Sequence, residues 1–224
     1  MYANNTQSTQ QAGMMIHADF LHVMTVDQPK LKSHLTAIAV NGVGQAITLA
    51  ALGIKVKFMT MPNISSEAKC RLVIPNTAPA NGLMPGANGS THQEQLLELI
   101  CLQISGAVAE HCFDEFEHYG NLGLENIEGS FEYLTAYELE YNAGTNIAFA
   151  GCTNVLELLF NQHYETAEAM AEKLAQDGSI SENDMARYLS GVSPEALGKL
   201  VLAALQEPGI EDDAERVHRI FIGS

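Results

Sequence analysis

The feature that most constrains this fold is an apolar segment, Leu35 to Leu52, broken by two amide side chains, Asn41 and Gln45. The amides are four residues apart, so on a helix they share one face. Gly53 follows the last apolar position, as is typical of a helix C-terminus. The segment predicts a buried helix over residues 32–52. An unpaired buried amide costs about 1–3 kcal/mol, so both side chains need polar partners or a wet cleft.

Composition and charge limit the classes of function. The chain has 224 residues, of which 46% are hydrophobic, enough to bury one sizeable core. Its net charge of −16, with only 11 Lys and Arg, argues against nucleic-acid binding and against anionic membrane surfaces. No segment is apolar and long enough for a membrane span. The polar N-terminus has no basic or apolar leader, which predicts a disordered tail at 1–13 and a cytoplasmic protein.

The remaining chain predicts helices with one small β element. Strands are expected at 54–61 and 71–74, and residues 75–90 form a long loop. Thr91 and Glu94 form a capping box that opens a helix, and a further helix covers 132–141. From Asn154 onward helix follows helix, with starts at Ser181 and at Ser193-Pro194.

The predicted fold class is therefore mainly α with a small β-hairpin or sheet. We expect a core over 14–150 and a helical part over 151–224 packed on it, in a single domain. The four cysteines, Cys70, Cys101, Cys112 and Cys152, form no Cys-x-x-Cys pair. Their apolar surroundings predict buried free thiols and argue against both disulfides and a cysteine zinc site.

The order of these features resembles the peptidase domain of the FtsH family of ATP-dependent zinc proteases, over roughly Leu35 to Leu189. In that family the zinc helix carries His-Glu-Ala-Gly-His, and this chain has Asn41-Gly42-Val43-Gly44-Gln45 in its place. A family segment Gly-Gly-x-Ala-Ala-Glu compares with Ser105 to Glu110. The third zinc ligand, an Asp at a helix start, compares with Ser130. The sequence contains no P-loop, so we do not expect the family's ATPase module on this chain.

The departures from the family pattern concern its catalytic chemistry. Asn41 and Gln45 replace the two His, Gly42 replaces the general base, and Ser130 replaces the Asp. Neutral amides are poor zinc ligands, and glycine has no side chain to accept a proton. The resemblance thus implies the fold but not the activity, and we expect no cofactor. The expected protein is a pseudo-peptidase that binds a peptide or protein partner, or assembles as a homo-oligomer as the family does.

Two other interpretations stay open. An active hydrolase would need a rebuilt site, either without metal or with zinc on the potential ligands between Glu110 and His118, namely His111, Asp114, Glu115 and His118. Because acidic runs usually face water, we favour a solvated helix end followed by a loop over a metal site for that segment. A purely structural oligomer is the third interpretation. For Asn41 and Gln45 themselves, a structural polar pair is the alternative to the lining of a vestigial cleft.

Overall fold

A computed structural model describes residues 28–62, 70–74, 90–113 and 122–221, with side-chain surroundings from residues 36 and 127 onward in the first and last ranges. The contacts divide the chain after Leu35, and residues 36–224 form one compact unit. The described residues are mainly helical with one small antiparallel sheet, which confirms the predicted fold class. The predicted tail at 1–13 lies outside them.

The apolar segment forms helix α2, Gln28–Ala51, as predicted but with an earlier start. Pro29 is compatible with this start because the first turn of a helix needs no backbone donor. Gly53 ends the helix with a positive φ of 76°, a conformation that glycine adopts without steric cost. The segment's apolar side chains are buried from Ala37 to Leu52, apart from the half-buried Ala50.

The sheet has three short strands in the order β2-β1-β3. Strands β1, Phe58–Thr60, and β2, Arg71–Val73, pair antiparallel as the sequence predicts, although β1 is shorter than the expected 54–61. Strand β3, Ser179–Ile180, pairs with the other edge of β1 and is not apparent in the sequence. Met59 and Ile180 are fully buried on the inner face, which ties the C-terminal half to the sheet.

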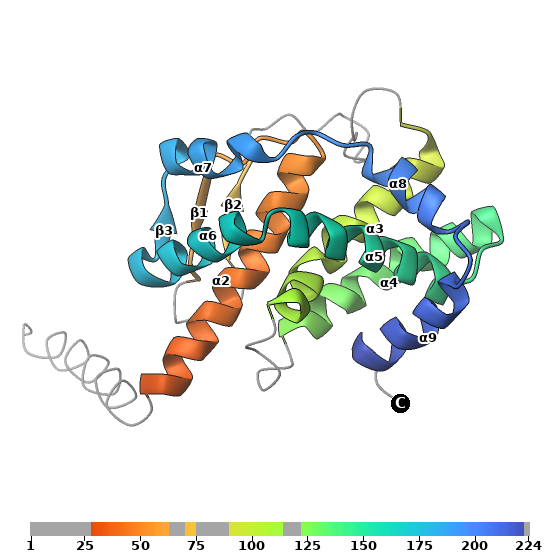
Figure 1. Ribbon diagram of the computed structural model, residues 1–224, viewed down its shortest axis with the longest axis horizontal. Coiled ribbons are helices and arrows are strands. Elements are labelled where there is room, and N and C mark those ends of the chain that lie inside the picture. Colours follow the sequence, from red (N-terminus) through yellow and green to blue (C-terminus); the bar gives the residue numbers. More distant parts are fainter. Residues whose placement is uncertain (1–27, 63–69, 75–89, 114–121, 222–224) are drawn as a thin grey trace, which may run out of the picture. The chain divides into compact units, whose positions relative to one another are not determined.

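Helix α3, His92–Cys112, is the centre of the helical part (Figure 1). Its predicted capping box is present, with Thr91 and Glu94 each accepting the other's backbone N–H. Helices α4, Leu122–Tyr141, and α5, Thr145–Gln162, pack against α3 and against each other. The helix expected over 132–141 is longer and starts at Leu122, and α5 continues through position 150, where the expected core ended.

The C-terminal part continues through α6, α7, a 3₁₀ turn, α8 and α9: Tyr164–Asp177, Glu182–Tyr188, Leu189–Gly191, Leu197–Ala204 and Ile210–Phe221. Ser181 caps α7 as predicted. The helix expected to start at Ser193-Pro194 begins only at Leu197. The reason is tertiary, because Glu195 donates its backbone N–H to Ala51 O at the end of α2 and not to a carbonyl of its own helix.

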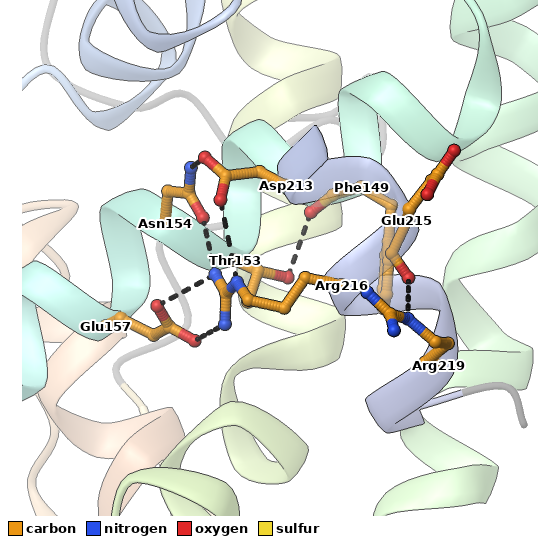
Figure 2. A network of polar contacts seen from close by, with 8 residues as sticks. All are labelled: Phe149, Thr153, Asn154, Glu157, Asp213, Glu215, Arg216 and Arg219. Atoms are coloured by element: carbon orange, nitrogen blue, oxygen red, sulfur yellow. Dashed lines mark hydrogen bonds and ion pairs between the residues drawn. The ribbon is translucent and has the colours of Figure 1, made fainter. Parts of the chain in front are cut away.

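Helix α9 is attached to α5 by apolar burial and by one arginine (Figure 2). Two of its own side chains, Ala214 and Val217, are buried. Arg216 donates to both carboxylate oxygens of Glu157, at 3.2 and 3.3 Å, and to the Asn154 side chain at 3.1 Å. Asp213 accepts from Asn154 at 2.9 Å and closes the network.

All four cysteines are free thiols, as predicted. Cys101 and Cys152 are buried between α3 and α5, and Cys70 and Cys112 are half-buried. Burial raises the pKa of the Cys70 and Cys112 thiols to about 12. These thiols are therefore protonated at neutral pH and are weak nucleophiles.

Candidate functional site

The two segments that carry the FtsH resemblance meet where α2 crosses α3. A Cβ added to Gly44 would lie 2.5 Å from Ala109 Cβ and 2.8 Å from Ser105 O. A Cβ added to Gly106 would lie 2.4 Å from Asn41 Oδ1. Real Cβ atoms do not approach so closely, so both positions require glycine. Small residues on each helix thus bring the two backbones together and place Asn41 directly on α3.

A cluster of three polar side chains, Asn41, Gln45 and Glu110, lies at this crossing and is called the slot cluster here. Asn41 is 5% exposed and donates through Nδ2 to Glu110 Oε1 at 2.5 Å. Gln45, half-buried, donates a long hydrogen bond of 3.5 Å to Asn41 Oδ1. Both the Oδ1 and the Nδ2 atom of Asn41 therefore have hydrogen-bond partners, which offsets the free-energy cost of burying the amide. A partner for Asn41 was expected from the sequence, but Glu110 was not identified as that partner.

Glu110 has an unusual environment for a carboxyl group. Burial at the crossing raises its pKa from 4.5 to about 7, against the lowering effect of the hydrogen bond from Asn41. Desolvation disfavours the charged form, whereas a donor to the carboxylate favours it. The group is half-buried at the C-terminal end of α3. It is the one member of the slot cluster able to exchange a proton near neutral pH.

Gly42, the position compared with the family's general base, lies on the side of α2 that faces the sheet. A Cβ there would meet Cys70 Cβ at 2.6 Å and Cys70 Sγ at 2.8 Å. Cys70 Sγ in turn donates to Ile38 O, one turn earlier on α2, at 3.2 Å. The space that a longer side chain at position 42 would need is thus occupied by Cys70. The sequence offered no signal for this contact, because the two residues are 28 positions apart.

Ser130, compared with the third zinc ligand, is fully buried on α4. Its Oγ donates to Ile127 O, one turn earlier in the same helix, at 2.6 Å. The hydroxyl is satisfied locally, in the manner common for serine within helices.

The residues present do not fit a zinc ion. Zinc sites use thiolate, imidazole or carboxylate donors, and Asn41, Gln45 and Ser130 offer amides and a hydroxyl that already have partners. Within the described ranges, no group of three or more His, Cys, Asp or Glu side chains is placed to hold a metal. Of the alternative set, Asp114, Glu115 and His118 lie outside the described residues. His111 is exposed and its ring contacts Phe221 edge-on, with centroids 5.5 Å apart.

Two surface cavities, of about 280 and 230 Å³, lie away from the slot cluster. The larger is lined by residues of α9 together with Asn146, and the smaller lies between the end of α2 and α7. Neither is lined by Asn41, Gly42, Gln45 or Ser130. In the part of the chain that the structure describes, no helix is long and apolar enough to cross a membrane.

The chain matches no protein-family model, and its sequence matches no curated protein.

Proposed function

We propose that this chain is a pseudo-peptidase, a binding or assembly module built on an FtsH-like peptidase frame. The observation that carries the proposal is the contact of Gly42 with Cys70, at the position compared with the catalytic Glu. A general base at this position would collide with the Cys70 side chain. The mechanism of a zinc peptidase needs that base beside a metal-bound water.

The arrangement of the slot cluster supports the same proposal. The residues compared with the two His ligands are tied to each other and to Glu110, so they hold α2 on α3. The segments compared with the family's motifs also meet in space at Gly44 and Gly106, as segments of one site would. A polar cluster that stabilises a helix crossing is consistent with a frame kept for binding after its chemistry was lost.

Metal content and proteolysis of the purified chain test this proposal. We expect less than about a tenth of a zinc per chain by elemental analysis without chelator or affinity metal, because amides bind zinc weakly. We also expect no cleavage of unfolded casein with or without added zinc. Sedimentation velocity then shows whether the module assembles with itself. Near one zinc per chain, or zinc-dependent cleavage, would overturn the proposal.

A second candidate function is hydrolysis from a rebuilt, metal-independent site. It is favoured by Glu110, whose pKa of about 7 suits a general base at neutral pH. The Glu110→Gln substitution keeps an acceptor for Asn41 but removes the titrating group. If the chain hydrolyses casein or a fluorogenic peptide, this candidate requires that Glu110→Gln abolish the activity while the fold persists by circular dichroism. Cleavage that survives the substitution excludes Glu110 as the base.

A further inference from the structure

Helix α4 has an outer face that is exposed to solvent in the part of the chain that the structure describes. Ile127, Ser130, Leu134 and Tyr137 are buried on its inner side, which packs on α3 and α5. The opposite side forms one exposed stripe at helical spacing, here called the α4 outer face: Glu128, Phe131, Glu132, Thr135, Glu138 and Leu139. Within it Phe131 is 44% and Leu139 82% exposed. These two large apolar side chains lie eight residues apart, about 12 Å along the helix axis.

The negative charges on this face destabilise helix α4. Helix α4 has five glutamates and no Lys, Arg or His. Glu128 and Glu132 are like charges four residues apart, which destabilises a helix. Glu138 lies in the last turn, where the helix dipole disfavours negative charge. In the described structure no ion pair relieves any of these three carboxylates, whereas Glu140, on another side of the helix, pairs with His92 at 3.2 Å.

The exposed apolar side chains and the neighbouring carboxylates together define which kind of partner fits this face. A partner that buries Phe131 and Leu139 would remove their apolar surface from water. If it also places cations beside Glu128, Glu132 and Glu138, it would offset their unfavourable negative charges. A basic amphipathic helix meets this description, because its apolar residues recur on one face and its Lys or Arg residues flank them. A second copy of this chain is a poorer complement, since each copy carries a net charge of −16.

We propose that the α4 outer face is a docking surface for a basic amphipathic helix of a partner protein. The proposal rests on the binding role proposed above and names the chemistry of the partner. Phe131 and Leu139 supply the apolar contacts, and the glutamates select a cationic partner and speed its encounter.

The test uses a fluorescein-labelled peptide of leucine and lysine at helical spacing, about four turns long. Its binding to the full chain is measured by fluorescence anisotropy. The test variant combines Leu139→Ala, Glu128→Gln and Glu132→Gln. A matched control removes the same groups elsewhere, with Leu158→Ala on α5, where Leu158 is 70% exposed, and Glu168→Gln and Glu172→Gln on the exposed side of α6. Both variants change the net charge equally.

We expect the test variant to weaken peptide binding at least about tenfold and the control to bind like the unaltered chain. A scrambled peptide of the same composition should bind at least about tenfold more weakly than the helical one. Equal losses in both variants, no loss in the test variant, or equal binding of the scrambled peptide would overturn the proposal. So would absence of binding, or a dimer in sedimentation velocity that only the test variant dissociates, because the occupant would then be a second copy.

The two proposals can fail separately. A chain without zinc and without proteolytic activity that ignores the peptide retains the proposed function and loses this docking surface. A chain that holds one zinc loses the proposed function, whatever its affinity for the peptide.

Discussion

At the scale of single residues, the slot cluster depends on the absence of side chains as much as on their presence. Asn41 reaches α3 only because position 106 is glycine, and its amide is then held by Glu110. Gly42 likewise leaves room for Cys70. Each polar contact therefore depends on a close backbone approach, and two predictions follow from these contacts.

The Gly106→Ala substitution should destabilise the protein by about 1–3 kcal/mol, because the new methyl group would overlap the Asn41 amide held at the crossing. Gly129→Ala is the matched control. Its Cβ would meet only the end of the Gln103 side chain, at 3.1 Å. Replacing a helical glycine there should be neutral or stabilise by up to about 1 kcal/mol. The unfolding free energy of both variants is measured in urea. Equal effects would show that the contact with Asn41 does not determine the cost of a side chain at position 106.

The raised pKa of Glu110 predicts how stability depends on pH. Its pKa is 4.5 in the unfolded chain and about 7 in the fold, so the folded state binds more protons between these values. The contribution of Glu110 is fully present below pH 4.5 and is lost as the pH rises to about 7. The loss should be about 2–3 kcal/mol, allowing for partial exposure to solvent.

Comparison with Glu110→Gln isolates this contribution from the other carboxylates. The difference in unfolding free energy between the two proteins should change by that amount across the window. Glu165→Gln, at an exposed position on α6, should instead run parallel to the unaltered chain. A constant difference for Glu110→Gln would show that the carboxyl titrates normally.

At the scale of elements, the helices differ in what holds them. Helix α3 has a capping box and is buried along most of its length. Helix α9 contributes only Ala214 and Val217 as buried residues and relies more on Arg216. A short helix of this kind gains most of its stability from docking rather than from its own propensity.

The Arg216→Ala substitution should lower the unfolding free energy by about 1–2 kcal/mol, since it removes several charged hydrogen bonds that are partly screened by solvent. Hydrogen exchange should quicken mainly in α9. Arg219→Ala is the control, because Arg219 donates only to the backbone oxygen of Glu215 among the contacts described (Figure 2). Its effect should stay within about 0.5 kcal/mol. Equal effects of the two substitutions would argue against the Arg216 network as the anchor of α9.

At the scale of the whole molecule, the four thiols report on the integrity of the core. Burial raises the pKa of the Cys70, Cys112 and Cys152 thiols, and Cys101 is buried away from solvent. Native protein at pH 8 should therefore react slowly with a thiol reagent, and unfolded protein should react at all four cysteines. The measurement is a stopped-flow trace with and without denaturant. Rapid reaction of one thiol in native protein would locate a mobile region, and fewer than four in denaturant would reveal a disulfide.

The sequence by itself determined the local features of this protein. The run of apolar residues specified α2, Thr91 and Glu94 specified the start of α3, and Gly53 specified the end of α2. These features follow from interactions between residues a few positions apart, so residue type and spacing suffice to predict them. The mainly α class with a small sheet follows from the same local signals.

Only the tertiary structure decided the long-range contacts. The pairing of β3 with β1, the hydrogen bond from Glu195 N to Ala51 O, and the approach of Glu110 to Asn41 join residues that are far apart in the chain. Each depends on how closely two packed elements approach, which spacing along a sequence does not encode. The sequence therefore identified Asn41 and Gln45 as residues that need partners, and the packing of α2 on α3 determined which partners they have.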